Sequence, residues 1–116
     1  MGALVEEVEA KTATVFLCGG DTNDKELLTP PAGQTFRLTD ITIANFFSTS
    51  TQARGISLSS QGSAKTPPVF LVPAGSTFTQ SFVTPIPFAG PAPVHAHTDS
   101  CPDNAAVYVT ISGTQQ

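Results

Sequence analysis

The sequence is short of charge and of tryptophan and tyrosine, although it contains eight phenylalanines. It contains no tryptophan, one tyrosine and two cysteines, and charged residues make up 12% of its 116 positions. A typical globular domain carries about twice that share of charged residues, roughly 25%. Serine, threonine, proline and glycine must therefore cover much of the surface. Because the cores of protein interfaces are depleted in lysine, glutamate and aspartate, we expect a surface that is used for repeated protein contacts.

The charge balance and the hydropathy pattern argue against two classes of partner. The net charge is −4 and no stretch is rich in lysine or arginine, so the chain offers no basic stripe for nucleic acid. It has no apolar run long enough for a transmembrane helix, and its first residues are acidic and lack a signal-peptide core. We expect no nucleic-acid partner, no membrane partner, and synthesis in the cytoplasm without a signal peptide.

Of the two cysteines, Cys18 ends the first predicted strand and Cys101 precedes the last one. They lie near each other if the terminal strands are neighbours, and a disulfide between them would then close a long loop. The alternative is a pair of buried thiols, because the lack of a signal peptide argues for a reducing compartment. The sequence leaves both states open.

The hexapeptide Pro-Ala-Gly-x-Thr-Phe occurs twice, from Pro31 to Phe36 and from Pro73 to Phe78. Each copy follows a short apolar stretch and precedes a threonine-rich run. Proline and glycine favour a tight reversal, whereas threonine and phenylalanine suit the strand that follows. We interpret each copy as a turn followed by a strand, at equivalent corners in the two halves of an antiparallel sandwich.

Alternation of apolar and polar residues predicts seven or eight short strands and no convincing helix. In the segment 35–47, the longest predicted strand, the apolar parity changes between Leu38 and Ile41, which predicts a β-bulge or a strand crossing near Thr39 and Asp40. The proline-rich stretch 85–93 is expected at a sheet edge or in a loop, because proline cannot donate to a central ladder. The predicted fold class is all-β, a single antiparallel β-sandwich of Greek-key or jelly-roll type.

The chain has the length of one domain, which we place at residues 12–116. Residues 1–11 precede it as an N-terminal arm that holds Leu4, Val5 and Val8 among glutamates. Two interpretations of this arm stay open: it docks on a neighbouring subunit, or it is a frayed end.

The residues that could carry chemistry form no catalytic set. His95 and His97 point to the same side of a predicted strand, and two imidazoles at this spacing can grip one metal ion. The chain has no third histidine, and the alternative is a polar strand face. We therefore predict that the protein binds no metal and no cofactor and is not an enzyme. If a metal did bind, His95 and His97 would be its candidate ligands. A metal-dependent enzyme is the competing hypothesis.

Three phenylalanines are expected to be available for contacts. Phe46 and Phe47 end a predicted strand and point to opposite sides, so at least one of them is expected to be exposed, and Phe88 lies in the proline-rich stretch. An exposed ring can anchor a subunit contact or stack on a sugar. A carbohydrate- or surface-binding module is therefore the alternative function. The interface candidates are Leu4, Val5, Val8, Phe46, Phe47 and Phe88.

The chain resembles the small β-sandwich and jelly-roll proteins that decorate or stabilise virus and phage particles. The resemblance rests on the two segments from Pro31 to Phe36 and from Pro73 to Phe78 with the strands around them, and it extends over residues 12–113. It implies a structural protein of the virion without catalytic activity. It also implies a homo-oligomer, for example a trimer, that sits on a shell or fibre protein and reinforces it through buried area.

Overall fold

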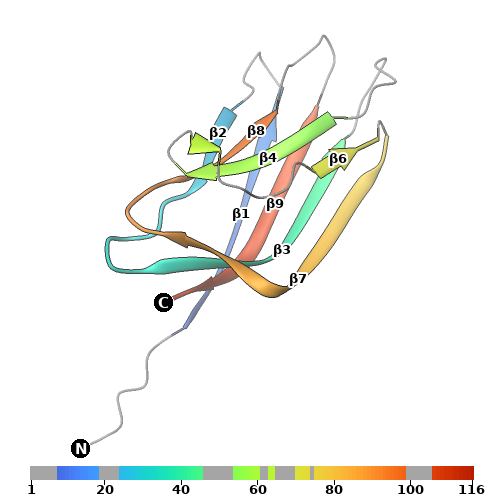
Figure 1. The fold of residues 1–116 in the computed structure, drawn as a ribbon. Coiled ribbons are helices and arrows are strands. Elements are labelled where there is room, and N and C mark those ends of the chain that lie inside the picture. The colour runs from blue at the N-terminus through green and yellow to red at the C-terminus, as the bar shows by residue number, and fades with distance from the viewer. Residues whose placement is uncertain are drawn as a thin grey trace, which may run out of the picture.

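The structure, a computed structural model, describes residues 8–18, 24–45, 54–60, 63–64, 70–73, 75–98 and 106–116. These residues form nine strands and no helix (Figure 1). The strands are β1 (Glu9–Leu17), β2 (Asp24–Leu28), β3 (Thr35–Asn45), β4 (Arg54–Ser60), β5 (Ser63–Ala64), β6 (Phe70–Val72), β7 (Thr77–Ala89), β8 (Val94–Thr98) and β9 (Val107–Gln115). Among the described residues, β5 and β6 are the only strands shorter than five residues.

The strands form two antiparallel sheets. One sheet has the order β1-β9-β3-β7, and the other has the order β2-β8-β4-β5, with β6 also paired to β4. The pairs are nested, β1 with β9, β2 with β8, β3 with β7 and β4 with β6. The chain is thus one long hairpin, rolled up so that its two arms alternate between the sheets, which is the jelly-roll arrangement. This confirms the predicted fold class.

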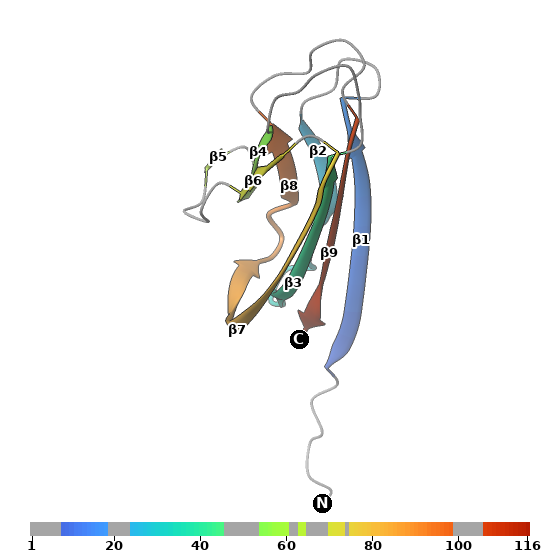
Figure 2. The ribbon, with the colours of Figure 1, turned by 90° about the vertical axis from the view of Figure 1, so that its right-hand side faces the viewer.

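The core lies between the two sheets, and its residues follow the alternation of the sequence. In Figure 2, β4, β6 and β8 lie on one side of the molecule and β9 and β1 on the other. Strand β9 buries Val107, Val109 and Ile111 and turns Tyr108 outward, as the sequence pattern predicts. Burying one such aliphatic side chain contributes about 1.5–3 kcal/mol. Apart from Cys18, the buried hydrophobic residues are Leu17, Phe36, Leu38, Ile41, Ile43, Ile56, Leu58, Phe70, Val72, Phe88, Val94, Ala96, Val107, Val109 and Ile111.

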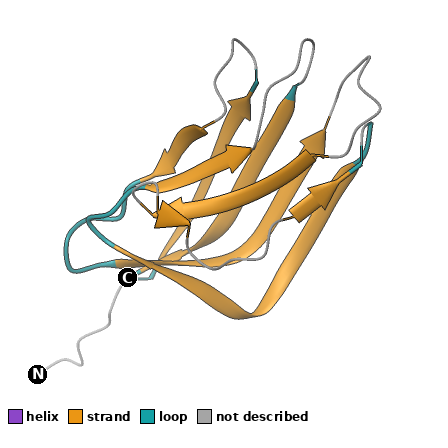
Figure 3. Ribbon diagram, turned by 45° about the horizontal axis from the view of Figure 1, so that its top comes forward, coloured by secondary structure: helices purple, strands orange, loops and turns teal. Residues whose placement is uncertain are grey.

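The two hexapeptides form equivalent corners. In both, the amide that follows the glycine donates to the carbonyl of the proline, at 3.0 Å from Gln34 to Pro31 and at 3.2 Å from Ser76 to Pro73. The glycines have φ angles of 85° and 75°, which an L side chain rarely adopts. Both corners lead from the second sheet into the first, one from β2 to β3 and the other from β6 to β7. The predicted turn followed by a strand is therefore confirmed in both halves (Figure 3).

Backbone hydrogen bonds join each corner to the segment beside it. The amide of Gly90 donates to the carbonyl of Gln34 at 2.8 Å, which joins the first corner to the end of β7. At the second corner, the amide of Gly75 donates to the carbonyl of Asn45 at 2.8 Å. The buried side chain of Asn45 in turn donates to the carbonyl of Val72 at 3.0 Å. The two backbone bonds thus extend the pairing of β3 with β7, and the Asn45 side chain ties β3 to β6 of the other sheet.

A β-bulge interrupts β3 at the predicted place. The register shifts between Leu38 and Asp40 in the pairing with β7 and in the pairing with β9. The shift returns the apolar side chains to the interior, so that Leu38 and Ile41 are both completely buried. The change of parity in the sequence therefore reports a real change of backbone phase.

Strand β7 lies at the edge of the first sheet, and it is longer than the sequence predicts. It pairs with β3 and continues through Pro85 and Pro87 to Ala89, so that β7, and not the segment 35–47, is the longest described strand. Its register jumps by several residues opposite the bulge, where Figure 1 shows the strand bending. An edge strand tolerates proline because the amides on one side of its backbone have no neighbouring strand to bond to, so a missing N–H there costs no ladder hydrogen bond.

The first strand starts earlier than predicted. Strand β1 begins at Glu9, where it pairs with Gln115, and not at Thr12. The last three residues of the expected arm, 9–11, therefore belong to the sheet. Residues 1–7 lie outside the described part of the chain.

Candidate interaction surface

The outer face of the four-stranded sheet carries an array of hydroxyl groups. The register brings Thr14, Thr110, Thr42 and Thr79 into one row across all four strands. The next row along the strands consists of Thr12, Ser112, Asp40 and Ser81. Each of these eight side chains is partly or fully exposed. We call these eight residues the hydroxyl face.

Hydrogen bonds hold these side chains in pairs. Between β1 and β9, the hydroxyl oxygens of Thr14 and Thr110 are 2.9 Å apart. Between β3 and β7, those of Thr42 and Thr79 are 3.4 Å apart. Cross-strand hydroxyl pairs of this kind stabilise a sheet by about 0.2–1 kcal/mol each. They also fix the rotamers of short side chains, so that the face is ordered in the free protein.

Asp40 is the one charged residue of the hydroxyl face, and neighbouring hydroxyls stabilise its charge. The hydroxyl of Ser81 donates to Oδ1 of Asp40 at 2.5 Å, and that of Thr39, the residue at the bulge, lies 2.8 Å from Oδ2. The Ser81 bond first and the Thr39 bond second lower the pKa of Asp40 below its ordinary value of 3.8, while desolvation opposes them. The carboxylate is therefore ionised near neutral pH.

The two ends of the face differ in chemistry. At one end, the ring of Phe16 stacks on that of Tyr108, with centroids 4.7 Å apart and planes inclined by 25°. At the other end, Arg37 on β3 lies between Thr114 and Pro87 in the register. Arg37 is exposed and forms no ion pair with any residue that the structure describes. Between these ends the face is polar and carries Asp40 as its one charged residue.

The candidate metal ligands lie on the other sheet. His95 and His97 share one face of β8, as predicted, and both turn toward Asp24 on β2. Nδ1 of His95 is 2.6 Å from Oδ1 of Asp24, and Nδ1 of His97 is 3.4 Å from Oδ2. In the described ranges, no three histidine, cysteine, aspartate or glutamate side chains form a group that could hold a metal ion. The arrangement is a pair of imidazoles that share one carboxylate on a polar strand face.

The prediction that Phe88 is available for contacts is wrong. Phe88 is 2% exposed and packs against Phe36, with ring centroids 6.5 Å apart, so it belongs to the core and offers no surface. The reason is that β7 continues through Pro85 and Pro87 and keeps its alternation, which turns the ring of Phe88 inward. Val8 is 53% exposed, as a contact residue requires. Four candidates lie outside the described residues: Leu4, Val5, Phe46 and Phe47.

The cysteines are only partly described. Cys18 is buried at the end of β1 and is disulfide-bonded. Cys101 lies outside the described residues, so its pairing with Cys18 stays a prediction. Within the described residues no helix is long and apolar enough to cross a membrane.

The hydroxyl face is a feature that the sequence analysis did not identify. Its signal is visible as alternating hydroxyl residues, Thr12 with Thr14, and Thr110 with Ser112. Such alternation predicts the polar side of each strand taken alone. The rows appear only when the register of four strands from distant parts of the chain is known.

Comparison with known proteins supplies a likeness in fold. No protein-family model matches the chain, and no curated protein matches it. A solved chain described as "Cyanophage Pam1 capsid asymmetric unit" superimposes on 98% of this chain and 91% of its own length, with a TM-score of 0.50 and 12% sequence identity. At this identity the likeness concerns the fold alone. The fold described here is thus one that also occurs in a phage capsid.

Proposed function

We propose that this protein is a non-catalytic structural component of a virus particle, which forms homo-oligomers and binds the shell of the particle. The hydroxyl face is the observation that carries the proposal. Its side chains are short, paired and nearly without charge, so little conformational entropy and little charge hydration are lost when another surface covers them. Its hydroxyls can donate and accept hydrogen bonds, which suits contact with another polypeptide.

The likeness in fold supports the same proposal. Jelly rolls occur in viral capsids, in lectins and in cupins, so the fold class alone does not choose between a structural, a sugar-binding and a metal-binding role. One structural neighbour is a chain of a cyanophage capsid asymmetric unit. Together with the charge-poor sheet face, this favours the structural role.

The sugar-binding alternative finds less support in the described residues. A sugar-binding platform needs an aromatic ring with a free, flat face. Tyr108 is 41% exposed, but one face of its ring is covered by Phe16. Phe46 and Phe47, the other candidates for a platform, lie outside the described residues.

A charged substitution in the hydroxyl face tests the proposed role. Thr42→Arg places a long cation in the row of four threonines, between Thr110 on β9 and Thr79 on β7. Thr29→Arg is the matched control, because Thr29 is exposed and lies outside the first sheet. The mass of each variant in solution is measured by light scattering on a sizing column over a range of concentrations.

We expect Thr42→Arg to raise the dissociation constant of the oligomer by at least about tenfold, through steric overlap and the cost of desolvating the added charge. The control should assemble as the wild type does. Equal assembly of Thr42→Arg and wild type, with both proteins folded, would show that the hydroxyl face is not an assembly surface.

A further inference from the structure

The free edge of β7 is a backbone surface that the described chain leaves without a partner strand. Among the described residues β7 pairs with β3 alone, so its other side presents unpaired amides and carbonyls. Native proteins usually protect such edges with lysine, proline or a bulge. The second half of β7 has Pro85 and Pro87, but the straight first half, residues 77–82, contains neither proline nor a charged residue. This half can accept an added strand.

The opposite edge of the sheet is protected. Strand β1 lies against β2 of the other sheet, which closes the sandwich on that side. It also carries an ion pair, with Nζ of Lys11 3.0 Å from Oε2 of Glu9. The unprotected edge is therefore the one at β7.

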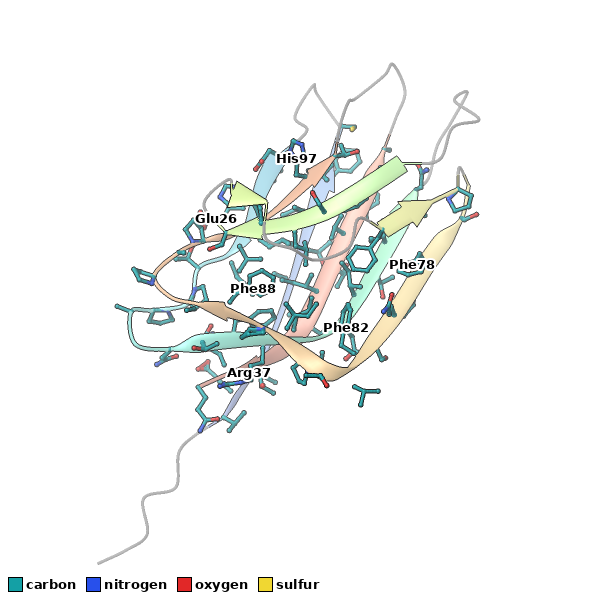
Figure 4. The ribbon with its side chains drawn as sticks, in the orientation of Figure 1. Glu26, Arg37, Phe78, Phe82, Phe88 and His97 are labelled. Carbon is teal, nitrogen blue, oxygen red and sulfur yellow. The ribbon has the colours of Figure 1, made fainter. Side chains whose placement is uncertain are left out.

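Apolar side chains accompany the free edge of β7. Phe78 and Phe82 lie on one side of the strand and contact Phe70 of β6, with ring centroids 5.7 Å and 6.3 Å apart (Figure 4). Both rings are only partly buried, and Gln80 between them is exposed. Val83, at the bend of the strand, is fully exposed. An added strand would gain main-chain hydrogen bonds from the edge and apolar contacts from these side chains.

The N-terminal segment of the chain has the length and the chemistry for this edge. The seven residues before Val8 span about 23 Å when extended, and the six residues of the free edge span about 20 Å. In an added strand, neighbouring side chains point to opposite faces, so one of Leu4 and Val5 lies on the side of Phe78 and Phe82 in any register.

Strand β1 is at the far edge of the sheet from β7, so pairing between two copies joins different surfaces of the two molecules. Such heterologous contacts generate closed rings, of which a trimer is one, or open chains.

We infer that residues 1–8 of one copy add as a strand to the free edge of β7, residues 77–82, in a second copy. This inference rests on the proposed self-assembly and adds to the hydroxyl face a second contact between copies. The same residues explain why Val8 is exposed on an isolated chain, since it precedes β1 and would be covered only in the assembly.

Charge substitutions in the full-length chain test the inference from both sides. Leu4→Asp with Val5→Asp makes the segment unsuited to an apolar site, and Gln80→Glu places a negative charge on the edge that repels Glu6 and Glu7. Lys25→Asp is the matched control, because it changes the net charge by the same amount as the double substitution and is exposed on β2. Oligomer mass is followed by light scattering against concentration, and circular dichroism checks that each variant is folded.

We expect both test variants to raise the dissociation constant of the oligomer by at least about tenfold, and the control to leave it unchanged. If the Leu4 and Val5 substitutions leave assembly intact, the inference is wrong and the proposed self-assembly still stands. If only Gln80→Glu weakens assembly, the edge pairs with a different segment and the inference is also wrong. A wild-type protein that stays monomeric at every concentration would overturn the proposed self-assembly as well.

Discussion

At the scale of single residues, the described part of the molecule contains one buried side-chain polar atom without a hydrogen bond. The hydroxyl oxygen of Thr98 is buried on β8 and has no hydrogen-bond partner among the described residues. Asn45, also buried, donates to the carbonyl of Val72 and so holds the second corner. The two residues illustrate opposite cases, since a satisfied buried amide stabilises a fold and an unsatisfied hydroxyl costs free energy.

Replacing Thr98 by valine should stabilise the protein. The two side chains have nearly the same shape, and the substitution removes a buried hydroxyl that gains nothing in the folded state. We expect the free energy of unfolding to rise by about 1 kcal/mol. Urea denaturation measures the change, and Thr84→Val, at an exposed position, serves as the control with no expected effect. A loss of stability in Thr98→Val would mean that the hydroxyl has a partner.

Removing the Ser81 hydroxyl should raise the pKa of Asp40. The Ser81 bond is the larger of the two causes that lower this pKa, so Ser81→Ala should move it further toward the ordinary value of 3.8 than Thr39→Ala does. Titration of the Asp40 carboxyl carbon by NMR measures both shifts. The reverse order of the two variants would contradict the assignment.

The same carboxylate makes stability depend on pH in a defined window. Because its pKa is lower in the folded than in the unfolded state, its contribution is complete above the unfolded value and is lost as the pH falls through the lowered folded value. The difference in unfolding free energy between wild type and Asp40→Asn should therefore shrink below about pH 4. A difference that stays constant down to about pH 2 would argue that Asp40 does not contribute in this way.

At the scale of elements, the features that the sequence predicted are those with a local cause. The two Pro-Ala-Gly corners depend on residues within one turn, and the bulge near Thr39 is visible as a change of parity within one strand. The burial of Phe88 could not be predicted in the same way, because its neighbouring prolines predict a sheet edge or a loop, and only the pairing with β3 shows that the edge strand continues through them. The hydroxyl rows could not be predicted from the sequence for the same reason, because they depend on the register between strands that are distant in the chain.

The close approach of β9 to the bulged strand predicts a strong effect of a small substitution. A Cβ atom at position 113 would overlap the carbonyl oxygen of Arg37 and lie 2.9 Å from Cζ of Phe36. We expect Gly113→Ala to destabilise the fold by about 3 kcal/mol.

The comparison is with Gly33→Ala at the first corner. A Cβ at this position would have no atom within 4 Å, and the cost comes from the positive φ of the residue. We expect this variant to lose about 1 kcal/mol. Urea denaturation of both variants tests the order, and an equal loss would contradict the account of the contact between β9 and β3.

At the scale of the whole molecule, the nested strand pairs place the first and the last strand side by side. Strand β1 pairs with β9 along its whole length, so the segment after Cys18 and the segment before Val107 leave the same end of the sheet. A disulfide from Cys18 to Cys101 would tie these segments together. It would close a loop of most of the chain.

Reduction should therefore weaken the fold. In the chain-entropy model a loop of this size stabilises a protein by about 4 kcal/mol. We expect the free energy of unfolding to fall by about that amount when Cys101 is replaced by serine, with no further loss on adding a reductant. Urea denaturation with and without reductant measures both effects. A further loss in Cys101→Ser on reduction would show that Cys18 pairs elsewhere.

The proposed role requires this chain to assemble with copies of itself. The decisive measurement is the mass of the purified wild-type protein, obtained by light scattering on a sizing column across a wide range of concentrations. We predict a defined oligomer, such as a trimer, that persists on dilution and also in the presence of reductant. A monomer at every concentration would contradict the proposed role.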